Sequence, residues 1–87
     1  MRRRETLTTH SYRYTVIFEA AEEGGYVVTC PALPGLVTEG DTIEEARAMA
    51  ADAIRCYLGS LKKDGQPFPI DDHHPLTEQV EVVIDAV

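Results

Sequence analysis

Two acidic residues and two histidines in a row form the one cluster in this sequence that could bind a metal ion: Asp71, Asp72, His73 and His74. Carboxylate and imidazole groups are ordinary ligands for divalent cations. Four consecutive residues in an extended loop rarely converge on one ion, because neighbouring side chains point apart. We therefore interpret the cluster as a solvated polar loop, and we expect neither a metal nor another cofactor.

Carboxylates on predicted strands could support metal-dependent cleavage of nucleic acid. A two-metal nuclease needs several carboxylates that project toward one point. The candidates fall on the less apolar strand faces, where a solvated charge is the simpler account: Glu19, Glu39, Glu81 and Asp85. His10 has no nucleophile or orienting carboxylate beside it in the sequence. We predict no catalytic residue and no enzymatic activity, with a cryptic metal-dependent nuclease as an alternative.

The charge distribution favours a basic partner. The net charge is −7, and three of the eight basic residues are Arg2, Arg3 and Arg4. From residue 5 onward, 15 acidic residues therefore stand against five basic ones, a net charge of −10. A body this acidic repels phosphate backbones and attracts positively charged proteins. We expect no direct nucleic-acid binding by the folded domain, and we interpret the arginine triplet as a solvated terminus, with a short nucleic-acid arm as the alternative.

Acidic residues and one tyrosine near two predicted turns could form the surface for such a partner. The expected partner-binding residues are Glu22, Glu23, Tyr26, Asp41, Glu44 and Glu45. The alternative is that Glu22 and Glu23 only solubilise the tip of a hairpin, and that Glu44 and Glu45 only favour the positive end of a helix dipole.

Alternating apolar and polar residues predict the four strands that would position these side chains. Their expected bounds are Tyr12–Ala20, Tyr26–Cys30, Leu36–Glu39 and Glu78–Val87. Apolar residues recur at three- and four-residue spacing from Ile43 to Leu61, which predicts one long amphipathic helix. Asp41 or Thr42 would cap its start, and Gly65 would end it.

Glycines and prolines mark the turns of the expected fold: Gly24, Gly25, Pro31, Pro34, Gly35 and Gly40. Gly24 and Gly25 supply positive φ angles for a tight hairpin, and because they connect strands they form no phosphate-binding motif. The order β-β-β-α-β predicts an α+β fold, a mostly antiparallel sheet with one long helix across one face. We assign residues 1–11 to an N-terminal tail and residues 12–87 to a single domain.

The small size of the chain predicts a thin core. A domain of 87 residues hides only about 60–65% of the surface that its unfolded chain exposes, so a homo-oligomer would gain stability. No apolar run approaches the roughly 18 residues of a membrane helix, and no signal peptide is evident, so we expect a cytoplasmic protein without a membrane partner. We interpret Cys30 and Cys56 as small buried hydrophobic residues, with a disulfide between them as the alternative.

The run from residue 22 to residue 46 carries a resemblance to a known family. It reads Glu22-Glu23-Gly24-Gly25-Tyr26-Val27-Val28, then Cys30-Pro31-x-Leu33-Pro34-Gly35, then Gly40-Asp41-Thr42-x-Glu44-Glu45-Ala46. Together with Tyr14-x-Val16 upstream and Ala53-Ile54-x-x-Tyr57-Leu58 downstream, this order and spacing closely resemble the HicB antitoxin family over about residues 12–70.

The resemblance implies a partial ribonuclease H-like fold without the nuclease's catalytic carboxylates. It also implies an antitoxin that binds and masks HicA, a small basic mRNA-cleaving ribonuclease toxin, and that forms dimers or tetramers. Many HicB proteins carry a C-terminal DNA-binding segment, and this chain stops before one could form, so we do not expect it to repress its operon alone. The alternative is a stand-alone homo-oligomeric adaptor for another protein.

Overall fold

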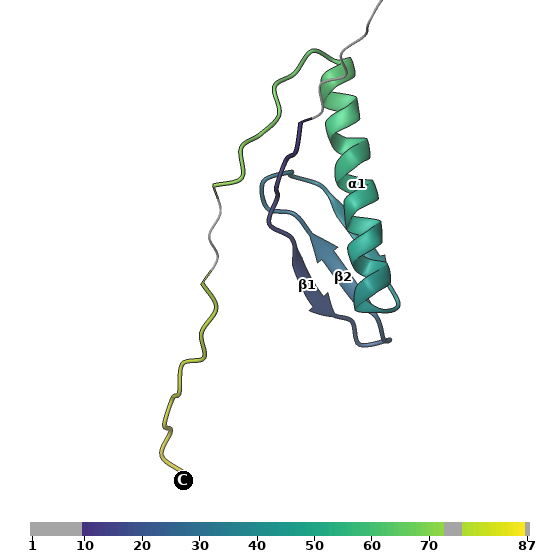
Figure 1. Cartoon of the computed structure of the whole chain (residues 1–87). Helices are drawn as coiled ribbons and strands as arrows, with labels where there is room; N and C mark the ends of the chain where they lie inside the picture. The colour runs from purple at the N-terminus through teal and green to yellow at the C-terminus, as the bar shows by residue number, and fades with distance from the viewer. Residues whose placement is uncertain (1–9, 73–75, 87) are drawn as a thin grey trace, which may run out of the picture.

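The computed structural model describes residues 10–72 and 76–86. Three short strands precede one long helix (Figure 1): β1 is Ile17–Ala20, β2 is Tyr26–Thr29, β3 is Val37–Gly40 and α1 is Ile43–Lys63. The strands form one antiparallel sheet in the order β1-β2-β3, and α1 lies across one face of it. The predicted α+β class is confirmed. No helix of the described residues is long and apolar enough to cross a membrane.

A tight hairpin joins β1 to β2, as the two glycines predicted. The carbonyl of Ala21 accepts from the amide of Gly24, and the amide of Ala21 donates to the carbonyl of Gly25, both at 3.0 Å. Gly24 and Gly25 have φ angles of 103° and 77°, which residues with a side chain rarely adopt. This pattern is a type I turn closed by a glycine bulge, and it sets the register of the sheet.

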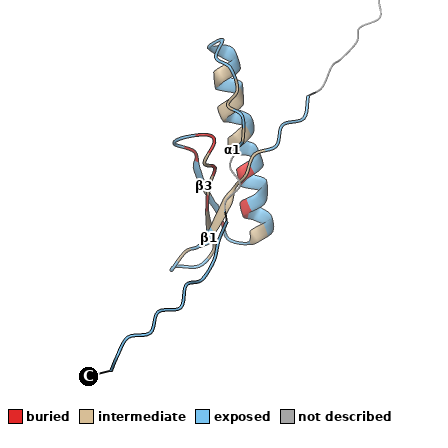
Figure 2. Cartoon of the chain, turned by 90° about the vertical axis from the view of Figure 1, so that its left-hand side faces the viewer, coloured by how far each residue is buried: buried red, intermediate tan, exposed pale blue. Residues whose placement is uncertain are grey.

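The core lies between α1 and the sheet (Figure 2). One buried cluster joins Val28 of β2 to Ala46 and Ala50 of α1. A second is built around Leu33 and Leu36, from the turn between β2 and β3. Among the described residues Leu33 and Val28 are the largest fully buried side chains, so the core is small.

The turn between β2 and β3 is attached to the helix. Gly35 has a φ angle of 87°, and the amide of Leu36 donates to the carbonyl of Leu33 at 3.1 Å. The Tyr57 hydroxyl of α1 donates to the carbonyl of Pro34 at 3.0 Å. The prolines and the glycine therefore shape a turn that packs against α1.

The two ends of α1 are capped as predicted. The Thr42 hydroxyl accepts from the amide of Glu45 at 3.1 Å, so Thr42 and not Asp41 is the N-cap. At the other end Gly65 has a φ angle of 68°, and its amide donates to the carbonyl of Lys62 at 3.1 Å. This arrangement is typical of a glycine that terminates a helix.

The first turn of α1 lies directly on the end of β3. A Cβ atom added to Gly40 would lie 2.6 Å from the Cα atom of Ala46. Both residues are buried, and the obstacle is backbone that cannot rotate away. Only glycine at this position lets the helix approach the sheet so closely.

β1 begins at Ile17, later than the predicted strand that starts at Tyr12. In the observed register Ile17 faces Thr29, so Thr15 would face Pro31. Because Pro31 has no amide hydrogen, it cannot continue the ladder, and the paired part of the strand stops there. A proline on the partner strand thus shortens β1.

The predicted fourth strand over 78–87 is not formed by the described residues. Residues 76–86 are extended and exposed, and they pair with no strand of the sheet (Figure 1); Val87 lies outside the described part. The alternation correctly indicated an extended backbone, but a strand also needs a neighbouring edge to bond with. The prediction that this segment pairs into the sheet of its own chain was therefore wrong.

The two cysteines differ in burial, and both are free thiols. Cys30 is buried as predicted, whereas the prediction for Cys56 was wrong, because Cys56 is exposed. The sheet-facing residues nearby on α1 are Ala53, Ile54 and Tyr57, which leaves Cys56 on the opposite side of the helix. The alternative of a Cys30–Cys56 disulfide is also wrong.

The contact between β3 and α1 can be tested with two glycine substitutions. Gly40→Ala should lower the free energy of unfolding by about 1–3 kcal/mol, because the added methyl group collides with the backbone of Ala46. Gly59→Ala is the control: Gly59 lies on the exposed side of α1 with open space around it, so alanine should raise stability by about 0.5–1 kcal/mol. Urea unfolding followed by circular dichroism measures both, and equal effects would contradict the close packing.

Candidate functional site

The register of the sheet brings the hairpin beside the start of α1. Tyr26, the first residue of β2, pairs with Ala20 on one side and with Gly40 on the other. The loop between β1 and β2 and the junction between β3 and α1 therefore lie at the same end of the molecule. All six predicted partner-binding residues come from these two segments.

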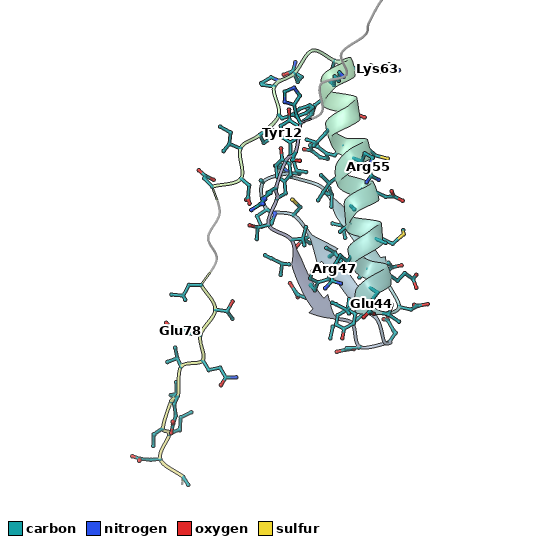
Figure 3. All side chains as sticks on the ribbon, in the orientation of Figure 1. Tyr12, Glu44, Arg47, Arg55, Lys63 and Glu78 are labelled. Atoms are coloured by element: carbon teal, nitrogen blue, oxygen red, sulfur yellow. The ribbon has the colours of Figure 1, made fainter. Side chains whose placement is uncertain are left out.

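A groove of about 480 Å³ lies at this end, and we call it the acidic groove. Four of the predicted residues line it: Glu23, Tyr26, Asp41 and Glu45. Glu22 and Glu44 are exposed outside the lining, and Figure 3 shows Glu44 at the start of α1. The lining also includes Glu39 and Met49, which the predicted set missed. Met49 follows Glu45 by four residues, a helical spacing that could have indicated it.

The acidic groove carries carboxylates without balancing cations. The ion pair found in residues 10–72 and 76–86 joins Arg55 to Asp52 at 2.7 Å, on the exposed side of α1. No lysine or arginine of the described part lines the groove, although Arg47 lies at the same end of α1 as Glu44 (Figure 3). Tyr26 is half-buried and Met49 is exposed, so an aromatic ring and a thioether line the groove together with the carboxylates. Aromatic residues and methionine are enriched at protein interfaces, and the surrounding charge suits a basic partner.

The candidate nuclease carboxylates do not gather. Glu19 and Glu39 both face Val27 across the ladder, which places them on the two outer strands, about 10 Å apart. Glu81 and Asp85 belong to the extended segment that leaves the sheet. The structure therefore offers no convergent acid cluster of the kind that two metal ions need.

Asp71 ties the chain after α1 to the residues before β1. Its Oδ2 atom accepts from the amide and from the hydroxyl of Thr15, both at 2.8 Å. The interpretation of this residue as part of a solvated loop was wrong, because Asp71 is half-buried and bonded. His73 and His74 lie outside the described residues. Within the described residues, no group of three or more potential ligands could hold a metal ion.

A second groove, of about 690 Å³, lies between the residues before β1 and the side of α1. It is lined by His10, Tyr12, Arg13, Tyr14, Ala51, Ile54, Arg55 and Leu58. His10 is exposed, and its ring centroid lies 6.4 Å from that of Tyr12. The lining contains no serine, threonine or cysteine that His10 could activate. Sequence reasoning did not find this groove, since its two walls are about 40 residues apart in the chain.

Burial makes the one nucleophilic side chain of the core unreactive. Desolvation raises the pKa of the Cys30 thiol, although the backbone amides of Leu33 and Ala32 act in the opposite direction. Desolvation likewise raises the pKa of Tyr14, whose hydroxyl donates to the carbonyl of Pro69 at 2.7 Å. Both groups stay protonated near neutral pH. Cys30 packs in the core, and Tyr14 bonds the residues before β1 to the chain after α1.

Comparison with known proteins identifies a family over most of the chain. Residues 14–83 match the model of a family described as "HicB_like antitoxin of bacterial toxin-antitoxin system". A UPF0150 protein of Thermoplasma acidophilum, Ta0767, is 46% identical over 65 residues, which are 75% of this chain and 94% of that protein.

Several relatives bear the name of an antitoxin. Antitoxin HicB 1 of Photorhabdus laumondii is 43% identical over 58 residues, covering 67% of this chain and 37% of that protein. Antitoxin HicB of Escherichia coli K12 is 33% identical over 70 residues, covering 76% of this chain and 51% of that protein. The chain thus spans about half or less of each antitoxin but nearly all of the Thermoplasma protein.

Thiol labelling tests the different burial of the two cysteines. In the native protein at neutral pH, an aromatic disulfide reagent should react rapidly with one thiol per chain, because Cys56 is exposed and the thiolate of buried Cys30 is rarely formed. Cys56→Ser should remove the fast reaction, whereas Cys30→Ser should leave it. Two fast thiols in the native protein would show that Cys30 is accessible.

The Asp71 contact should contribute measurably to stability. Asp71→Ala leaves the amide and hydroxyl of Thr15 without their acceptor, and should lower the free energy of unfolding by about 1–3 kcal/mol. Amide hydrogen exchange at Thr15 should become faster in this variant. Asp52→Ala removes an equal charge from an exposed ion pair and should leave both measurements unchanged. An unchanged exchange rate at Thr15 would contradict the role assigned to Asp71.

Proposed function

This chain belongs to the HicB-like antitoxin family of bacterial toxin–antitoxin systems, and from that premise we propose that it binds and masks a small, basic, mRNA-cleaving ribonuclease of the HicA type. The family is one of antitoxin modules and not of enzymes. The protein would act by occupying the active surface of the toxin in a stoichiometric complex. Its fold would be a partial ribonuclease H-like one, and its place of action the cytoplasm, where mRNA is found.

The acidic groove is the observation that carries this proposal. Glu23, Glu39, Asp41 and Glu45 line one hollow without a cation from the described part of the chain. A ribonuclease that binds RNA must present positive charge, and the same positive surface is attracted to this groove. Masking by charge complementarity also explains how one surface can exclude RNA, because the carboxylates occupy the place of phosphates.

Apolar contact at the centre of the groove would supply affinity. Interface energy is concentrated in a few desolvated side chains, while charges at the rim mainly steer association. Tyr26 and Met49 are placed to be those central contacts, since both line the groove among the carboxylates. We further propose that the functional unit is a homo-oligomer, a dimer or tetramer, and that the folded domain does not bind nucleic acid itself.

The second candidate function is an adaptor that binds a protein other than a toxin. It is favoured by the coverage of the relatives: the chain spans 37% and 51% of the two HicB proteins described above, but 94% of the Thermoplasma protein, whose name states no function. Toxin contacts in the longer relatives could therefore lie in regions that this chain does not match. A pull-down from native cytosol with mass-spectrometric identification separates the two functions, because an adaptor would recover no ribonuclease.

Neutralising the acidic groove should weaken toxin binding. The triple variant Glu23→Gln, Glu39→Gln, Asp41→Asn should raise the dissociation constant for the cognate toxin about tenfold or more, and the loss should shrink at high salt. The control is Asp52→Asn, Asp64→Asn, Asp72→Asn, which changes the net charge equally at exposed residues outside the groove. Calorimetry at two salt concentrations and inhibition of RNA cleavage measure the effect. Equal losses in both variants would exclude the groove as the binding surface.

The wild-type protein provides the more basic test. An excess of it should stop RNA cleavage by the purified cognate toxin. If cleavage continues at the same rate, the antitoxin function itself is wrong, whatever the groove variants do.

A further inference from the structure

The segment after the Asp71 contact carries aliphatic side chains into solvent. Val80, Val82 and Ile84 are 76%, 71% and 82% exposed, and they alternate with Gln79, Glu81, Val83 and Asp85, a set that is polar except for Val83. This alternation is that of a strand with one buried face. Figures 1 and 2 both show the segment running away from the helix and the sheet. A row of exposed aliphatic side chains on an extended backbone needs a partner that covers it.

β1 offers a matching open edge. Hydrogen-bonded and non-bonded residues alternate along an antiparallel pair. Because Ala21 bonds to Gly25, Ile17 and Glu19 direct their backbone groups toward β2. The backbone groups of Phe18 and Ala20 therefore point to the outer edge, where the described residues place no further strand. Such an edge is a template for one more strand.

The chain's own segment is poorly placed to fill this edge. Asp71 is held to Thr15 at 2.8 Å, and Pro69 accepts from Tyr14, so the chain after α1 starts level with the beginning of β1. At about 3.3 Å per residue, β1 ends about 17 Å beyond Thr15, whereas Val80 would lie about 30 Å beyond Asp71 in an extended chain. The apolar alternation therefore begins only after the chain has passed the end of its own β1.

We propose that residues 78–86 of one copy add to the open β1 edge of a second copy, and that the exchange is reciprocal. Each sheet then gains its fourth strand from the partner, which gives a two-fold symmetric dimer. Val80, Val82 and Ile84 lie on the helix side of the extended sheet, beside the half-buried side chains of Val16 and Phe18. The β-β-β-α-β arrangement is completed between two chains and not within one.

Charge also favours this site over the rest of the acidic surface. The segment carries Glu78, Glu81 and Asp85. Next to the start of β1 stands Arg13, which is exposed and has no ion-pair partner among the described residues. Arg55, which is paired with Asp52, lines the groove beside it, and Asp71 lies next to Thr15, so the arginines here offset part of the negative charge that dominates the rest of the domain. An acidic strand from a second copy is repelled less here than at the acidic groove, which no lysine or arginine of the described residues lines.

Two tail variants with the same charge test the exchange. The inference rests on the homo-oligomer proposed above and not on toxin masking. Light scattering during gel filtration should give wild-type protein twice the chain mass of 9.6 kDa. Val82→Asp places a charge on the docking face and should raise the dimer dissociation constant at least about tenfold. Gln79→Asp adds the same charge to the opposite face and should leave the dimer intact.

Isotope-filtered nuclear Overhauser spectroscopy identifies which chain supplies the strand. In a refolded mixture of ¹³C-labelled and unlabelled chains, contacts between tail valine methyl groups and the Phe18 ring should appear between chains. Contacts only within one chain would overturn the exchange. So would a dimer that Val82→Asp leaves unchanged, although the homo-oligomer would then stand. A monomeric wild-type protein would overturn both, and none of these outcomes changes whether the protein inhibits a toxin.

Discussion

The backbone contact between Gly40 and Ala46 is the constraint on which the rest of the structure depends. It lets the first turn of α1 rest directly on the last residue of β3, so that Ala46 and Ala50 reach Val28. The same residue, Gly40, pairs with Tyr26 in the ladder, which places the hairpin beside the helix start. One close approach thus assembles the small core and brings together the two segments that form the acidic groove.

The small core of one chain explains why covering the exposed aliphatic side chains of residues 78–86 would add considerably to stability. With strands of four residues and Leu33 and Val28 as the largest fully buried side chains described, little apolar area is hidden within one chain. Each aliphatic side chain that moves from water to an interior contributes about 1.5–3 kcal/mol. Three such side chains in residues 80–84 represent a large share of the 5–15 kcal/mol that typically stabilises a domain. Exchange between chains would convert this exposed surface into core.

The distribution of charge distinguishes two surfaces of the domain. Carboxylates line the acidic groove, which no lysine or arginine of the described residues lines, while Arg13 and Arg55 stand near the beginning of β1. The proposed basic partner and the proposed strand from a second copy would therefore bind at different places on the same domain. Nothing in either place requires chemistry from this chain, since Cys30 is buried and protonated and the strand carboxylates stand apart. Function by contact alone is consistent with a family of antitoxin modules.

Local chemistry in the sequence was sufficient for the order β-β-β-α, the hairpin at Gly24 and Gly25, and both ends of α1. Periodicity, helix caps and positive φ angles depend only on neighbouring residues, so they can be read without the fold. The acidic end of the molecule could also be predicted, because the turns that build it are local. The tertiary structure alone decided where β1 begins, which depends on Pro31 across the ladder, and that Asp71 bonds to Thr15. It also added Glu39 and Met49 to the groove, left Cys56 in solvent, and left residues 78–86 unpaired although the outer edge of β1 is open. Each of these features depends on a residue distant in sequence or on a second chain. An alternating pattern predicts the two faces of a strand, but it does not predict which strand lies beside it.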